Sequence, residues 1–151
     1  MTLTKSSLMN RVAIGKAVGF VIGVVGFIIL PYMWPDVSYE FRFGILFWYA
    51  TVGAVIGVFG VWNRHPVFYF PMPWFVRAPI IGAWMNFVLV LFAEPQFSAL
   101  MIGMLGHDSP YTSAYWFVLE GAVIGGLIGW TATHFAGEGP ATMGHKDDVP
   151  V

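Results

Sequence analysis

The residues of this chain best suited to chemistry are polar side chains inside apolar segments. Glu120, Asn86, Tyr49 and Thr51 all lie roughly two helical turns or less from one end of an apolar stretch. A carboxylate at such a depth in a membrane is costly unless it is protonated, paired or wetted by a cavity. We therefore predict one polar cluster centred on Glu120. It serves either as a site for a proton, a cation or a substrate, or as a hydrogen-bonded contact between helices.

A second group with possible chemistry lies in the connection after the third apolar stretch. Met101, Met104 and His107 are three residues apart, and thioethers with an imidazole suit Cu(I). The same spacing fits an apolar interfacial helix that uses methionine as a flexible filler, and we favour that interpretation. His65 and His134 stand at the ends of two apolar stretches. They suggest either simple capping of helix ends or a haem or quinone site.

Other kinds of chemistry find no support in the sequence. Cysteine is absent, which excludes disulfides, thiolate metal sites and cysteine nucleophiles. We find no Ser-His-Asp order, metalloprotease motif or phosphate-binding loop, and no basic patch suited to nucleic acid. We therefore expect no enzymatic activity, no resident metal or cofactor and no nucleic-acid partner.

The elements that must position these residues are four apolar stretches of about 20 residues, each long enough to cross a bilayer as a helix. Hydrophobic residues make up 58% of the 151 residues and charged residues only 10%. We predict an all-α membrane protein whose transmembrane domain, residues 1–136, precedes a flexible polar tail, residues 137–151. The predicted spans are 12–33, 43–62, 74–93 and 115–134.

The chain also contains an internal similarity. Segments 47–62 and 115–130 match at seven of sixteen positions without a gap and share the block Gly-Ala-Val-Ile-Gly. This favours two tandem two-helix hairpins, approximately 11–66 and 77–134, related as a parallel repeat. Chance similarity between apolar segments of low diversity is the alternative.

Glycines recur at intervals of four residues in three of the stretches, which puts them on one face of each helix. Such rows let helix backbones approach closely in lipid. The rows can serve contacts within this chain, as in a glycine zipper, or contacts in an oligomer or larger complex. The glycines that we expect at helix contacts are Gly15, Gly19, Gly23, Gly53, Gly57, Gly121, Gly125 and Gly129.

The basic residues are distributed asymmetrically. All but Arg42 fall on one side of the predicted topology, and the positive-inside rule then places both termini in the cytoplasm, with the protein in a cell inner membrane. We expect Lys16 and Arg77 to extend to the surface as anchors. The basic residues on the cytoplasmic side are Lys5, Arg11, Lys16, Arg64, Arg77 and Lys146.

These observations predict a small multi-pass inner-membrane protein that acts by assembly. It would serve as an accessory or scaffold subunit of a larger membrane complex, or as a homo-oligomer, in contact with membrane lipids. The first alternative is a small transporter or channel that uses Glu120. A further alternative is a cofactor-bearing membrane anchor of a redox complex.

Overall fold

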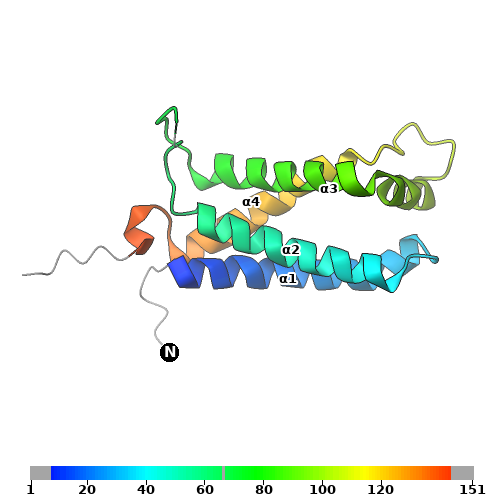
Figure 1. Ribbon diagram of the computed structural model, residues 1–151, viewed down its shortest axis with the longest axis horizontal. Coiled ribbons are helices and arrows are strands. Elements are labelled where there is room, and N and C mark those ends of the chain that lie inside the picture. The colour runs from blue at the N-terminus through cyan, green and yellow to red at the C-terminus, as the bar shows by residue number, and fades with distance from the viewer. Residues whose placement is uncertain (1–7, 66, 144–151) are drawn as a thin grey trace, which may run out of the picture.

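The computed structural model describes residues 8–65 and 67–143 and is all-α in its regular elements (Figure 1). Four of its helices are long and apolar enough to cross a membrane, which confirms the predicted all-α architecture with four candidate spans. A short 3₁₀ helix follows them. The elements are α1 (Leu8–Met33), α2 (Tyr39–Phe59), α3 (Trp74–Leu105), α4 (Trp116–Ala136) and η1 (Pro140–Met143).

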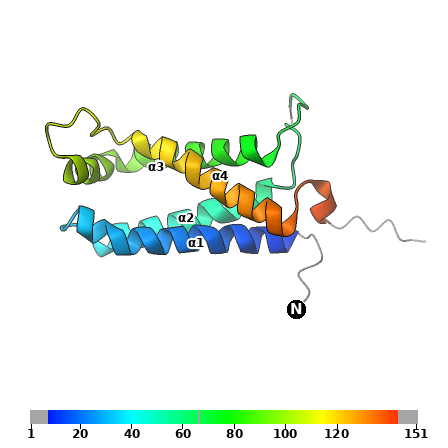
Figure 2. The ribbon, with the colours of Figure 1, turned by 180° about the vertical axis from the view of Figure 1, so that it is seen from behind.

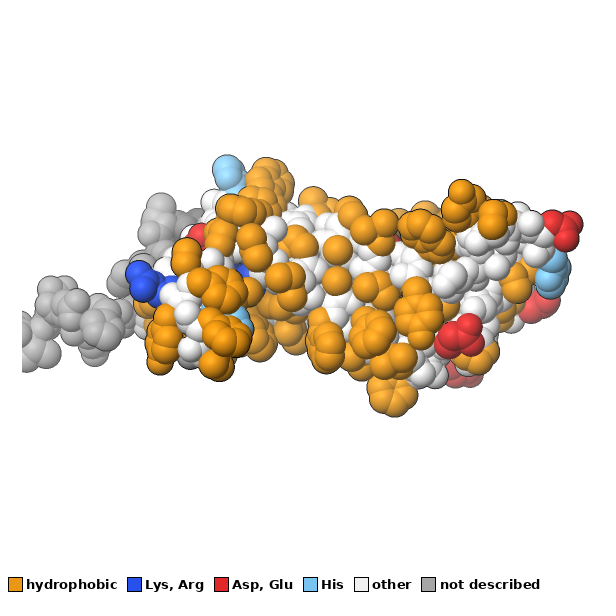
Figure 3. All heavy atoms as spheres, turned by 90° about the horizontal axis from the view of Figure 1, so that it is seen from above, with side chains coloured by type: hydrophobic (Ala, Val, Ile, Leu, Met, Phe, Trp, Pro, Cys, Tyr) orange, Lys and Arg blue, Asp and Glu red, His pale blue; other side chains and the backbone are white. Residues whose placement is uncertain are grey.

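The helices pack as two antiparallel pairs. Helix α1 packs along α2, and α3 packs along α4. Between the pairs the main contact is α1 with α4, which crosses the bundle obliquely and ends beside the start of α1 (Figures 1 and 2). The face seen in Figure 3 carries mostly hydrophobic side chains between the two ends, with Lys and Arg at one end and most of its acidic side chains at the other. This distribution suits a bundle surrounded by lipid.

Helix α3 is longer than the predicted span. It continues to Leu105 through a kink at Ala93, whose φ of −126° and ψ of 27° are not helical. The kink precedes Pro95, which has no backbone N–H to donate and collides with the preceding turn. The part of α3 after the kink therefore runs in a different direction and brings Phe97 into the core, with 3% of its surface exposed.

All eight glycines that we expected at helix contacts lie against the other helix of their own pair. A Cβ atom on Gly57 would lie 2.7 Å from the Cα of Val12, and one on Gly121 would lie 2.5 Å from the carbonyl oxygen of Gly82. These separations are shorter than real Cβ atoms tolerate. Gly44 is different, because a Cβ there would meet nothing within 4 Å.

Two arginines join the pairs at the basic end of the bundle. Arg11 of α1 donates to the carbonyl oxygen of Gly137 and, at 3.1 Å, to Oγ1 of Thr133 in α4. Arg77 of α3 donates to the carbonyl oxygen of Trp62, just after α2. Each arginine thus donates to a carbonyl oxygen that follows the C-terminal end of a helix in the other pair.

The prediction that Arg77 is a surface anchor is wrong. Its guanidinium is satisfied inside the protein by two carbonyl oxygens and by Glu138, whose Oε2 lies 3.2 Å from Nη2. Only 4% of Arg77 is exposed, and 1% of Arg11. Lys16 is exposed, as an anchor requires. Lys5 and Lys146 lie outside the described residues.

The first part of the predicted tail has defined structure. Residues 137–143 include η1, and the backbone N–H of Gly139 donates to the carbonyl oxygen of Gly60 at 2.9 Å. Thr142 is buried. The remainder, 144–151, lies outside the described residues, and its flexibility stays a prediction.

We predict that Gly19→Ala and Gly125→Ala each lower the free energy of unfolding by about 1–3 kcal/mol, because the added methyl group collides with backbone of the neighbouring helix. The measurement is reversible unfolding in mixed micelles. Gly44→Ala is the matched control. It should be neutral or stabilising by up to about 1 kcal/mol, because alanine has the higher helix propensity. Equal effects at all three positions would contradict the prediction.

Candidate functional site

Asn86 on α3 is the centre of a buried polar network. Its Nδ2 donates to the carbonyl oxygen of Phe117 at 2.8 Å and to the hydroxyl of Tyr49 at 3.2 Å. Its Oδ1 accepts a hydrogen bond from the indole Nε1 of Trp48 at 3.1 Å. Only 1% of Asn86 is exposed. One amide therefore connects α2, α3 and α4 within the apolar interior.

Tyr49 extends this network to Glu120. The tyrosine hydroxyl, which accepts from Asn86, donates to Oε2 of Glu120 at 3.1 Å. The predicted grouping of Glu120, Asn86 and Tyr49 is therefore present as a chain of hydrogen bonds. It runs from the indole of Trp48 to the carboxyl group on α4.

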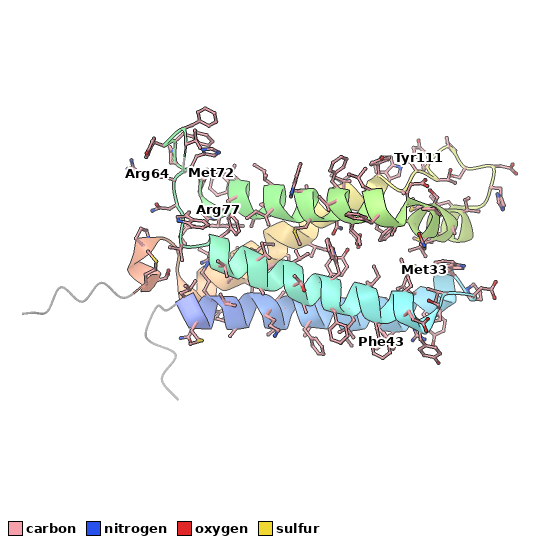
Figure 4. The ribbon with its side chains drawn as sticks, in the orientation of Figure 1. Met33, Phe43, Arg64, Met72, Arg77 and Tyr111 are labelled. Carbon is pink, nitrogen blue, oxygen red and sulfur yellow. The ribbon has the colours of Figure 1, made fainter. Side chains whose placement is uncertain are left out.

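Glu120 lies on the wall of a cavity of about 400 Å³ that residues from all four helices line. The walls are apolar side chains, such as Leu30, Phe41 and Leu100, and Met33, labelled in Figure 4, lines the cavity at the end of α1. The cavity is partly open, and Glu120 on its wall is an exposed residue. The polar network thus presents a carboxyl group to a space that is otherwise almost entirely apolar.

Thr51 does not belong to the cluster. It is exposed, and its hydroxyl donates to the carbonyl oxygen of Phe47 in its own helix at 2.8 Å. Two residues along a helix turn the side chain by roughly 200°, so Thr51 and Tyr49 point to different faces. Thr51 was included in the predicted cluster because of its depth along the helix, but its direction around the helix axis places it on another face.

Trp48 is the member of the network that the sequence analysis missed. Trp48 packs against two clusters of buried hydrophobic residues, one that includes Val90 and one that includes Ile56. A tryptophan in such a place needs an acceptor for its indole N–H. The indole N–H of Trp48, the residue before Tyr49, was therefore the signal in the sequence for this member of the network.

The three residues considered as Cu(I) ligands have different surroundings. Met101 is buried and Met104 exposed, and both line the cavity, whereas His107 is exposed in the loop after α3 and is not part of its wall. Within the described residues, no three His, Asp or Glu side chains are grouped closely enough to hold a metal ion.

The two histidines considered for haem or quinone have local contacts. Nδ1 of His65 accepts from the backbone N–H groups of Val67 and Phe68 at 3.2 and 3.1 Å. His134 stacks on Trp130 with ring centroids 5.6 Å apart. These contacts support local ordering of a loop and of the last turns of α4.

Comparison with protein-family models, with curated proteins and with solved structures found no significant match.

We predict that Asn86→Ala lowers the free energy of unfolding by about 1–2 kcal/mol, because it leaves the buried donor of Trp48 and the carbonyl of Phe117 without their partner. Thr51→Ala is the control at a similar depth. It should change stability little, because its hydroxyl bonds only to its own helix. Unfolding in mixed micelles measures both. An Asn86 variant as stable as the Thr51 variant would show that the network contributes nothing.

Proposed function

We propose that this protein is a small membrane transporter that binds an amphipathic molecule in the four-helix cavity. The molecule is apolar and carries a positively charged or hydrogen-bond-donating group, which meets Glu120. The observation that carries the proposal is the position of Glu120, on an apolar wall and hydrogen-bonded to Tyr49.

The chemistry of the cavity supports this choice of ligand. A carboxyl group in apolar surroundings is stabilised by a proton, a cation or a hydrogen-bond donor. Tyr49 supplies one donor, to Oε2, and a carboxylate has acceptor capacity for several. The amino group of an amphipathic amine would donate to the remaining acceptor sites of the carboxylate. Its apolar part would contact side chains such as Phe41 and Phe117.

We also propose that the two hairpins are tandem copies related by an axis near the membrane normal. In the alignment of the copies, Gly15 and Gly53 correspond to Gly82 and Gly121. Gly15 lies against the backbone of Gly53 in the first hairpin, and Gly82 lies against the backbone of Gly121 in the second. The exchange of arginine contacts, with Arg11 bonded to the end of α4 and the other arginine to the end of α2, further supports this.

The proposal of assembly as a scaffold subunit or homo-oligomer stands second. It rests on the glycine rows, which can serve contacts in an oligomer or larger complex as well as contacts within this chain. All eight glycines contact helices of the same chain, so the rows do not favour an additional partner. A cofactor-bearing anchor of a redox complex is the third proposal, and no contact among the described residues favours it.

We expect phenylbutylamine to bind the purified protein at least about tenfold more tightly than phenylbutanol, because only the amine pairs with the carboxylate. Glu120→Gln should abolish that difference and leave the alcohol's affinity unchanged. Isothermal titration in detergent measures both affinities.

Glu94→Gln is the matched control. Glu94 lies near the same end of the bundle, accepts from Ser98 at 2.6 Å and is not part of the cavity wall. It should keep the preference for the amine. The proposal fails if the amine binds no better than the alcohol, or if both variants lose the preference equally.

We propose the inner membrane as the location, with both termini in the cytoplasm, on the basis of the basic end of the bundle. Reporter domains fused at Asp108 and after the last residue should report opposite sides of the membrane. A cytoplasmic signal from the Asp108 fusion would contradict this orientation.

A further inference from the structure

A second cavity, of about 290 Å³, lies at the basic end of the bundle, between the end of α2, the start of α3 and the loop that joins them. Its apolar lining includes Phe59, Ile80 and Ile81. Phe59 and Ile80 are themselves exposed, by 41% and 55%, so this side continues into the lipid-facing surface of the bundle.

The other side of this cavity carries two arginines in different states. Arg77 is buried, and its guanidinium is occupied by carbonyl oxygens and Glu138. Arg64 is exposed, and no hydrogen bond or ion pair holds its guanidinium within the described residues. Arg64 therefore brings an uncompensated positive charge to the rim of an apolar groove. Figure 4 shows Arg64, Met72 and Arg77 together at this end, far from Tyr111.

The described part of the loop beside the groove carries exposed aromatic side chains. A bridge between Arg64 and Pro71 and a hydrogen bond of 2.8 Å from the N–H of Met72 to the carbonyl oxygen of Asn63 close its base. At its tip, Phe68 and Tyr69 are each 73% exposed. The loop projects sideways from the bundle beside α3 (Figure 1). Exposed aromatic rings beside a basic side chain are typical of the headgroup level of a membrane.

We propose that this groove is a binding site for an anionic glycerophospholipid. The headgroup phosphate pairs with the Arg64 guanidinium, which offers a fork of N–H donors suited to phosphate oxygens. An acyl chain lies along Phe59, Ile80 and Ile81 toward the hydrocarbon. The charge of Arg64 and the apolar groove below it are complementary to the two parts of such a lipid. The site is separate from the Glu120 cavity and does not depend on its function.

Binding of single lipids to the full chain tests the proposal. Native mass spectrometry from detergent would compare phosphatidylglycerol with phosphatidylcholine of the same acyl chains. We expect wild-type protein to retain phosphatidylglycerol about fivefold more strongly, from one additional charge pair near the surface. Arg64→Gln should reduce that preference to none. Because Arg64 is exposed, this variant is expected to fold normally.

Arg42→Gln is the control, since it makes the same substitution at the opposite end of the bundle, where Arg42 donates to the carbonyl oxygen of Phe27. It should keep the preference. Ile80→Asp tests the groove itself and should weaken binding of both lipids at this site. Equal preference in wild type and Arg64→Gln would overturn the proposal. So would displacement of the lipid by inorganic phosphate at equal concentration, because a free anion would then suffice.

Discussion

A fully buried amide in an apolar bundle must find its hydrogen-bond partners on other helices, and in this protein that requirement falls on Asn86. Its donors and acceptor are used by Phe117, Tyr49 and Trp48. Because these partners come from α2 and α4, rotation of any of the three helices about its axis would leave a polar group unsatisfied without water to replace it. The network therefore fixes the relative phase of α2, α3 and α4.

The two hairpins differ where the cavity lies. In the alignment that we propose for them, Asn86 corresponds to Gly19, which lies directly against the backbone of Tyr49. Past this point the kink at Ala93 redirects α3, and Phe97 packs on Phe41 and Phe117 with ring centroids 5.6 and 4.5 Å away. The bend and these rings give the cavity one wall, and the tyrosine directs Glu120 toward it.

Length and hydropathy were sufficient to predict four helices, because each segment must satisfy its own backbone in lipid. Depth along the helices was sufficient to group Asn86, Tyr49 and Glu120, but depth carries no information about rotation. Thr51 therefore joined the predicted cluster, and Trp48 was left out of it. Similarly, hydropathy ended the third span near Ala93, because it does not distinguish a helix that ends from a helix that bends. Such features depend on which faces meet, and that is decided by packing between segments distant in the sequence.

The arginines at the basic end show why residue type alone did not predict their roles. The carbonyl oxygens of Trp62 and Gly137 follow the ends of α2 and α4, and a guanidinium can donate to several acceptors at once. Arg11 donates to Gly137 and Arg77 donates to Trp62, and both side chains become buried. Arg64 follows α2 in the loop and donates to neither of these carbonyl oxygens within the described residues. Its side chain therefore remains exposed, as the lipid site that we propose requires. An arginine in this protein is thus either a structural contact or a candidate ligand contact, according to whether carbonyl oxygens lie within its reach.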